Sequence, residues 1–151
     1  MKEFENKVVL ITGGADGIGK GCVMRFAEQG ATVIVGDIQS DKGHALADEI
    51  GASARFVHLD VTDDQAWQNA VALITREFGA LHILVNNAGV SSRTTIEDLD
   101  LAGWRAIHAV NLDAIFLGSH HAIPLIHASG GGSIVTISSA LGIKPFASYP
   151  A

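Results

Sequence analysis

Five short apolar runs, separated by stretches with helical periodicity, constrain the fold of this chain more than any other feature. The runs lie at residues 7–12, 31–37, 54–60, 81–86 and 132–138. They are apolar on both faces, which is typical of strands buried on both sides of a parallel sheet. The intervening stretches predict helices over about 17–29, 40–50, 62–78 and 103–127. This alternation indicates one α/β domain over residues 1–151, with a doubly wound parallel sheet, right-handed crossovers and strand order 3-2-1-4-5.

Local signals predict where the helices begin and where one of them bends. Thr62, with Gln65 three residues later, fits a capping box at the start of the third helix. Pro124 lies inside the last predicted helix and is expected to bend or break it near residues 122–123.

A glycine-rich loop, TGGADGIG at residues 12–19, joins the first predicted strand to the first helix. Gly13 allows a sharp turn, Gly17 allows a phosphate to approach the backbone, and Gly19 allows close packing of helix and strand. The free N–H groups of the helix N-terminus attract the pyrophosphate of a dinucleotide. This is the Rossmann-like arrangement, although a glycine turn without a ligand is the alternative.

An acidic residue at the end of the second strand predicts which dinucleotide binds. Asp37 follows Gly19 by 18 residues, where a carboxylate can accept hydrogen bonds from both adenosine ribose hydroxyls. It would repel a 2′-phosphate, and neither Asp16 in the loop nor Ile38 offers a positive charge. We therefore expect NAD rather than NADP. The alternative is that Asp37 is simply a solvated residue at the end of a strand.

Polar residues also follow other predicted strands. Asp60 ends the third run, Asn87 follows the fourth and Ser139 follows the fifth. Because ligands bind beyond the carboxyl ends of parallel strands, we expect these residues and Asp37 to border one site.

In combination, these segments resemble the short-chain dehydrogenase/reductase family over essentially the whole chain. The matching segments are TGGADGIG, Asp60-Val61, NNAG at residues 86–89, the asparagine of VNLDAIF and the serine of GSIVTISSALG. The resemblance implies a cofactor site built from five segments. Its members are Thr12, Gly13, Asp16, Gly17, Ile18 and Gly19 in the glycine loop, Asp37 and Ile38, Asp60 and Val61, Asn87, Ala88 and Gly89, and Val110.

The same resemblance implies two catalytic residues in this chain. Ser139 would hydrogen-bond the oxygen of the substrate, and Asn111 would hold a kink in the long helix and order a water in a proton relay. The family's acid/base is a tyrosine with a lysine four residues later, whose charge lowers the tyrosine pKa.

The end of the sequence departs from this pattern. The family places its tyrosine about thirteen residues after the serine, whereas Tyr149 is ten residues after Ser139 and no lysine follows it. We expect Tyr149 to belong to a loop, and the chain to be the first part of a longer protein. The alternative, a natural end at Ala151, would leave the fifth strand an open edge and the long helix with an uncovered apolar face.

Composition narrows the classes of partner. The net charge of −6 argues against nucleic acid, and no run is long enough to cross a membrane. The start of the chain lacks the features of a signal peptide, and its single cysteine, Cys22, fits a reducing cytoplasm. A small alcohol or ketone is the expected substrate, and the resemblance favours a homo-oligomer, either dimer or tetramer.

The histidines and tryptophans have simpler interpretations. His120 and His121 point in different directions on a helix, and His127 lies about 10 Å from His120 at 1.5 Å per residue, so no metal site is predicted. Trp67 and Trp104 both lie early in predicted helices and are expected to have packing roles.

Three functions fit these observations. The first is an NAD-dependent oxidoreductase of secondary alcohols and ketones. The others are a non-catalytic NAD-binding sensor or scaffold, and an epimerase or dehydratase of the same fold. Asn111 and Ser139 favour the first over the second, and the G-x3-G-x-G spacing favours it over the third. Ser91 and Arg93, in the polar segment after the fourth strand, are weaker candidates for substrate contacts.

Overall fold

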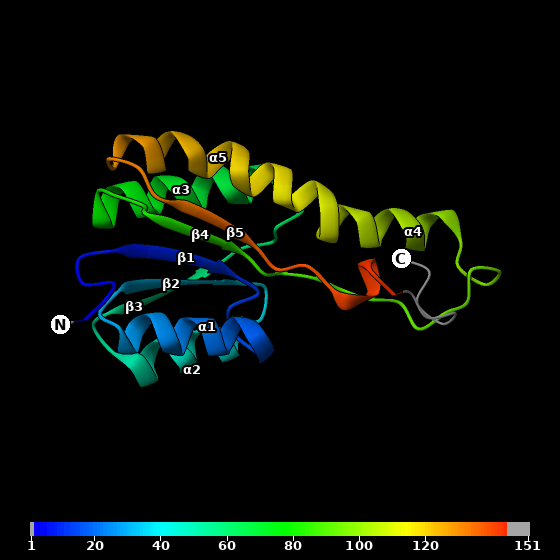
Figure 1. Ribbon diagram of the computed structural model, residues 1–151, viewed down its shortest axis with the longest axis horizontal. Helices are drawn as coiled ribbons and strands as arrows, with labels where there is room; N and C mark the ends of the chain where they lie inside the picture. Colours follow the sequence, from blue (N-terminus) through cyan, green and yellow to red (C-terminus); the bar gives the residue numbers. More distant parts are fainter. Residues whose placement is uncertain (1, 145–151) are drawn as a thin grey trace.

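The computed structural model describes residues 2–144 and contains one parallel sheet between two layers of helices (Figure 1). The strand order is β3-β2-β1-β4-β5, as predicted. The strands are β1 (Val8–Thr12), β2 (Thr32–Asp37), β3 (Ala54–His58), β4 (Ile83–Asn86) and β5 (Ser133–Thr136). β3, β4 and β5 are each two or three residues shorter than predicted.

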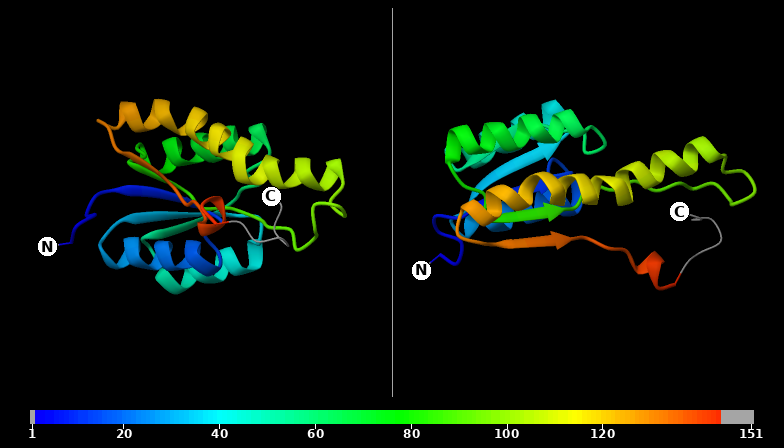
Figure 2. Two further views of the ribbon diagram at one scale, coloured as in Figure 1. Left: turned by 45° about the vertical axis from the view of Figure 1, so that its right-hand side comes forward. Right: turned by 90° about the horizontal axis from the view of Figure 1, so that it is seen from above.

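Helices cover both faces of this sheet. In Figure 1, α1 (Gly17–Glu28) and α2 (Ser40–Ile50) lie side by side below the sheet, and α3 (Asp64–Phe78) and α5 (Ala114–Ala128) lie above it. The remaining helix, α4 (Leu101–His108), continues the direction of α5 beyond the ends of the strands (Figure 2). It joins α5 through a π-helical turn, Ala109–Asp113.

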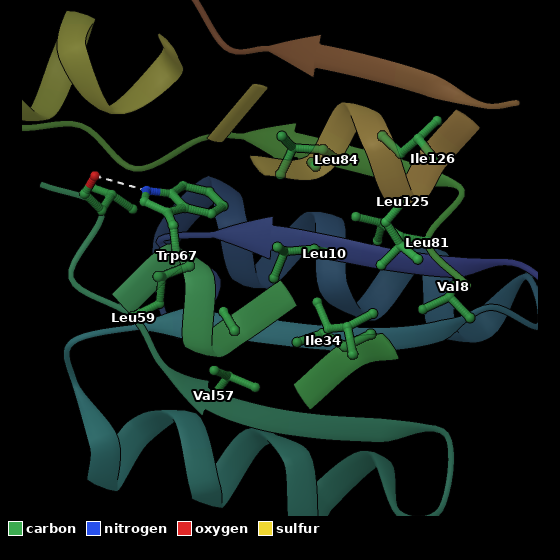
Figure 3. Close-up of a cluster of buried hydrophobic side chains, with 14 of the residues drawn as sticks. Val8, Leu10, Ile34, Val57, Leu59, Trp67, Leu81, Leu84, Leu125 and Ile126 are labelled. Carbon is green, nitrogen blue, oxygen red and sulfur yellow. Dashed lines mark hydrogen bonds between the residues drawn. The ribbon is translucent and has the colours of Figure 1, made fainter. Parts of the chain in front are cut away.

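The alternation of side chains along β1 produces two cores, one on each face. Leu10 packs with Trp67, Leu84 and other residues beneath α3 and α5 (Figure 3), whereas Ile11 packs with Val23 on the opposite face, beneath α1 and α2. All five residues of β1 are buried, which explains why the run carries no polar alternation.

Trp67 anchors α3 to its surroundings, as expected of a packing residue. Its ring is fully buried, and its Nε1 donates a hydrogen bond to the carbonyl oxygen of Val61 at 2.9 Å. A Cβ on Gly118 of α5 would lie 2.8 Å from this ring, so α3 and α5 approach closely only because residue 118 is glycine.

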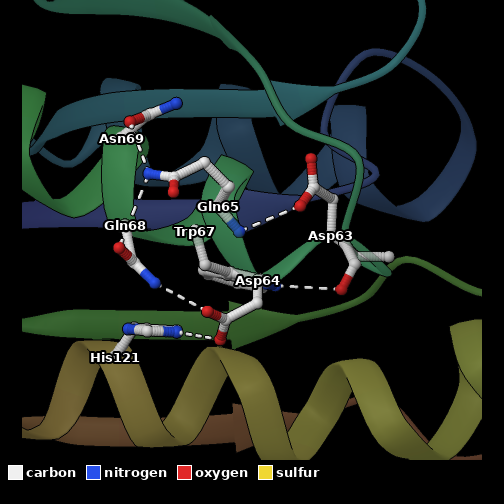
Figure 4. A network of polar contacts seen from close by, with 8 residues as sticks. Asp63, Asp64, Gln65, Trp67, Gln68, Asn69 and His121 are labelled. Atoms are coloured by element: carbon white, nitrogen blue, oxygen red, sulfur yellow. Dashed lines mark hydrogen bonds and ion pairs between the residues drawn. The ribbon is translucent and has the colours of Figure 1, made fainter.

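A polar contact joins the same two helices at their edge (Figure 4). His121 Nε2 lies 2.7 Å from Asp64 Oδ1, and this contact, followed by one from Gln68, lowers the pKa of the Asp64 carboxyl. No group of three or more potential metal ligands occurs among residues 2–144.

Two local predictions were wrong. The cap of α3 is Asp63, whose carboxylate accepts from Gln65 N–H at 2.9 Å, because Thr62 instead donates to Asp60. Helix α5 runs through Pro124 without a break, and the irregular turn lies at Ala109–Asp113 instead. A proline deletes only one backbone donor, and the buried side chains of α5 hold the turns on either side of it.

Trp104 packs less completely than Trp67: it is 38% exposed, and its ring lies against His108. It lies on α4, which extends past the sheet and therefore has little core to pack against (Figure 2).

Apolar side chains are exposed on one flank of the described residues. β5 lies at the edge of the sheet with all four of its residues exposed. On the long helix, Leu112, Phe116 and Ile123 are more than half exposed. No helix among the described residues combines the length and hydropathy that a membrane span needs.

Candidate cofactor site

A pocket of about 510 Å³ lies at the carboxyl ends of β1, β2 and β4, the edge at which α4 projects from the sheet (Figure 1). It is lined by Gly13, Asp16, Gly17, Ile18, Asp37, Ile38, Gln39, Leu59, Asp60, Val61, Asn87, Ala88, Gly89, Val90 and Val110. Twelve of these fifteen residues belong to the predicted cofactor set; the other three are Gln39, Leu59 and Val90.

The glycine loop forms one wall of the pocket, and its three key glycines have different roles. Gly13 and Gly17 have positive φ values of 60° and 54°, a conformation that favours glycine. A Cβ on Gly17 would meet nothing within 4 Å, so the backbone there is open to a ligand. A Cβ on Gly19 would lie 2.0 Å from the carbonyl oxygen of Gly13, so Gly19 permits the close packing that the sequence predicts.

Thr12 and Gly19, which were also predicted to contact the pyrophosphate, are not among the residues that line this pocket. Thr12 is buried beneath the loop because it is the last residue of the central strand β1. Its hydroxyl oxygen accepts hydrogen bonds from the N–H groups of Asn87 and Ala88, both at 3.0 Å. The Asn87 side chain in turn donates to the carbonyl oxygens of Thr12 and Gly13.

Asp37 is 5% exposed and holds the second wall of the pocket. One carboxylate oxygen accepts from Ala15 N–H at 2.9 Å, and the other accepts from Gln39 N–H at 2.9 Å. These bonds orient the carboxylate and tie the glycine loop to the end of β2. Each oxygen retains a further lone pair for a ligand hydroxyl.

Asp60 and Val61 follow β3 and line the far side of the pocket. The backbone N–H and then the hydroxyl of Thr62 donate to Asp60, and these bonds lower the pKa of its carboxyl. The carboxylate is therefore fixed at the pocket wall in its charged form at neutral pH.

The last wall comes from the segment after β4 and from the π-helical turn. Asn111, within this turn, donates from Nδ2 to Val90 O at 2.8 Å and accepts at Oδ1 from Val90 N–H at 2.9 Å. The long helix is irregular at Asn111, where the family resemblance implied a kink. The Asn111 side chain itself does not line the pocket, because both of its polar groups are bonded to Val90.

Ser139 does not line the pocket either. It is exposed, and its hydroxyl caps a short 3-10 turn, Ala140–Gly142, by accepting from Leu141 N–H at 3.1 Å. Ser91 and Arg93 are exposed in the segment before α4, and Tyr149 lies outside the described residues.

One charged neighbour of the pocket could not be found from the sequence. Lys42, on α2, forms an ion pair with Asp16, which lies 26 residues earlier. This contact, followed by the Gly17 N–H, lowers the pKa of the Asp16 carboxyl. No motif marks Lys42, since only the crossing of the chain from the loop to α2 brings the two residues together.

Comparisons with known proteins agree with this geometry. A family model described as short chain dehydrogenase matches residues 7–151. A 2,5-dichloro-2,5-cyclohexadiene-1,4-diol dehydrogenase from Sphingobium indicum is 45% identical over 144 residues, covering 93% of this chain and 58% of that protein.

Two further relatives are similar over almost the whole chain. A 3-alpha-(or 20-beta)-hydroxysteroid dehydrogenase from Mycobacterium tuberculosis is 44% identical, covering 91% of this chain and 53% of that protein. A cyclohexanol dehydrogenase from an Acinetobacter species is 38% identical, covering 99% of this chain and 62% of that protein. The chain thus spans little more than half the length of these curated relatives.

Proposed function

Because the chain belongs to the short-chain dehydrogenase family, we propose that it forms the cofactor domain of an NAD-dependent oxidoreductase acting on a secondary alcohol or its ketone. The observation that carries this proposal is the pocket at the carboxyl ends of β1, β2 and β4, walled by the glycine loop and by Asp37. A bound nicotinamide cofactor would supply the hydride acceptor or donor.

The residues present fit a dinucleotide. The open backbone at Gly17 and the N-terminus of α1 supply N–H donors and a positive dipole for a pyrophosphate. Asp37 would accept hydrogen bonds from the ribose, while Asp60 and Val61 would lie beside the adenine. Asn87, Ala88, Gly89 and Val110 would contact the rest of the cofactor.

A preference for NAD over NADP is supported by the charges around the pocket. The described residues of its lining include three carboxylates, Asp16, Asp37 and Asp60, and no lysine or arginine. A 2′-phosphate beside Asp37 would be repelled by the negative charge of its carboxylate. Because this side chain is almost fully buried, water and salt screen the repulsion only weakly.

For the substrate, we infer a ring-bearing secondary alcohol. The three relatives described above are named for a cyclohexadiene diol, a hydroxysteroid and cyclohexanol, all cyclic alcohols. Oxidation would transfer a hydride from the carbinol carbon to the nicotinamide and a proton from the hydroxyl to a base. Ser139 would hydrogen-bond the substrate oxygen, and Asn111 would position the π-helical turn beside it.

Location and assembly are also part of the proposal. The single cysteine, Cys22, is consistent with the cytoplasm. The exposed apolar side chains of the long helix, such as Phe116 and Ile123, support a homo-oligomer, either dimer or tetramer.

The test combines binding and turnover. Calorimetry on the purified chain should show NAD binding more tightly than NADP, and the protein expressed from its complete gene should reduce NAD with cyclohexanol. Ser139→Ala should remove most of this turnover and leave NAD binding intact. Binding without turnover across a panel of cyclic alcohols would favour a sensor or scaffold, and equal affinity for NADP would refute the NAD assignment.

A further inference from the structure

An ion pair crosses the boundary between the cofactor pocket and a second depression beside it. The pocket includes Asp16, Ile38 and Gln39, and the depression, about 420 Å³, is lined by residues 38–42. Ile38 and Gln39 line both, so the two spaces are adjacent just beyond Asp37. The carboxylate of Asp16 and the ammonium of Lys42 meet across this boundary at 2.5 Å.

The chain brings these two residues together through its topology. Asp16 caps α1 and Lys42 lies in the first turn of α2, and these helices are neighbours on one face of the sheet (Figures 1 and 2). One oxygen of Asp16 accepts from Gly17 N–H, and the other accepts from Lys42. The contact with Lys42 lowers the pKa of the Asp16 carboxyl, which is charged at neutral pH.

Lys42 is the only lysine or arginine among the described residues that line either space. Asp41, in the depression, adds a negative charge. His58 Nδ1 lies 3.2 Å from Ser40 Oγ at its border. A phosphate reaching past Asp37 into the depression would find one strong cation, and that cation is already neutralised by Asp16.

From this arrangement we propose that Asp16 is a specificity-determining residue that excludes NADP by holding Lys42, in addition to repelling the 2′-phosphate directly. The proposal rests on the proposed function, since it assigns the depression to the 2′ side of the adenosine ribose. Without the charge at residue 16, the Lys42 ammonium is free to pair with the phosphate. Lys42 is thus a latent 2′-phosphate ligand in a site that otherwise favours NAD.

The test uses two probes that differ by the 2′-phosphate, AMP and adenosine 2′,5′-bisphosphate, with binding measured by calorimetry. Asp16→Asn removes the charge and keeps an amide that can cap α1. We expect it to raise the affinity for the bisphosphate by about three- to fivefold, the upper range for one exposed charge contact, and to change the affinity for AMP less than about twofold.

Further variants distinguish the effect of Lys42 on bisphosphate affinity from the effect of the overall surface charge. The gain should disappear in Asp16→Asn/Lys42→Gln and persist in Asp16→Asn/Lys20→Gln, because Lys20 lies near Asp16 but pairs with Glu49. Asp63→Asn is the matched cap substitution on α3, outside both spaces, and should leave both affinities unchanged.

Each outcome decides a different claim. An unchanged bisphosphate affinity in Asp16→Asn, or a gain that survives the loss of Lys42, would overturn the role of the ion pair. A gain lost equally with Lys20→Gln would assign the effect to net charge alone and would also overturn it. If the unmodified chain bound neither AMP nor NAD, the proposed function itself would fail, and the ion pair would be left without a ligand to select.

Discussion

The Thr12 hydroxyl oxygen and the Asn87 backbone N–H are 3.0 Å apart, and the Asn87 side chain returns a hydrogen bond of 2.9 Å to the Thr12 carbonyl oxygen. These reciprocal bonds join the ends of β1 and β4, the two strands between which the pocket opens. Thr12 is 2% exposed, so its hydroxyl shapes the pocket from below without lining it.

Thr12→Val should therefore destabilise the protein by about 1–3 kcal/mol, because it leaves the partly buried N–H groups of Asn87 and Ala88 without their acceptor. The free energy of unfolding from urea titration measures this loss. Thr12→Ser keeps the hydroxyl and should lose less than about 1 kcal/mol. Equal stabilities of the two variants would contradict the role assigned to the hydroxyl.

Gly19→Ala should cost about 2–3 kcal/mol or more, since its Cβ would overlap the carbonyl oxygen of Gly13. The glycine loop would have to move, and NAD affinity should fall as well. Gly21→Ala, on the same helix with open space around it, should raise stability by about 0.5–1 kcal/mol through helix propensity. If Gly19→Ala left stability and NAD affinity unchanged, the loop would not need this close approach.

Asn111→Ala should release the segment after β4, because it removes both hydrogen bonds to Val90. Hydrogen exchange at the Val90 amide should then be about five- to tenfold faster, in keeping with the net contribution of one exposed hydrogen bond. Asn111→Asp keeps the acceptor for Val90 N–H and should retain part of the protection. Unchanged exchange in the alanine variant would mean that other contacts hold Val90.

His82 should make the protein less stable in mild acid. Its Nδ1 accepts from Val8 N–H at 3.0 Å, and burial, followed by the charge of Lys7, lowers its pKa. As the pH falls below about 6.5, the unfolded chain binds a proton that the folded chain resists, so the free energy of unfolding decreases.

The control for His82 is His82→Asn, whose side-chain oxygen can still accept but does not titrate. Urea midpoints of the two proteins, compared between pH 7.5 and 5, are expected to diverge only on the acid side. Parallel pH profiles would show that the titration of His82 does not contribute.

Most of the fold follows from local patterns in the sequence. The five apolar runs predict the strands because burial on both faces leaves no position for polar alternation, as the fully buried β1 shows. Local signals were less reliable where two of them competed. Thr62 and Asp63 could both cap α3, and the acceptor at Asp60 drew the Thr62 hydroxyl away from the helix.

The candidate site could be predicted as a set of segments, but not as a set of contacts. The glycine loop, Asp37, Asp60 and residues 87–89 follow successive parallel strands, whose carboxyl ends must share one edge of the sheet, and the pocket lies there. The catalytic roles of Ser139 and Asn111 were predicted from the resemblance alone, and they stay predictions.

The sequence by itself determined the architecture and the place of the pocket, because hydrophobic periodicity and glycine positions act over short distances. Only the tertiary structure decided which residues make contact around that pocket. Thr12 bonds to Asn87 beneath it, Asn111 bonds to Val90, and Lys42 pairs with Asp16. Each of these contacts joins residues at least 21 positions apart, so it depends on the packing of strands and helices.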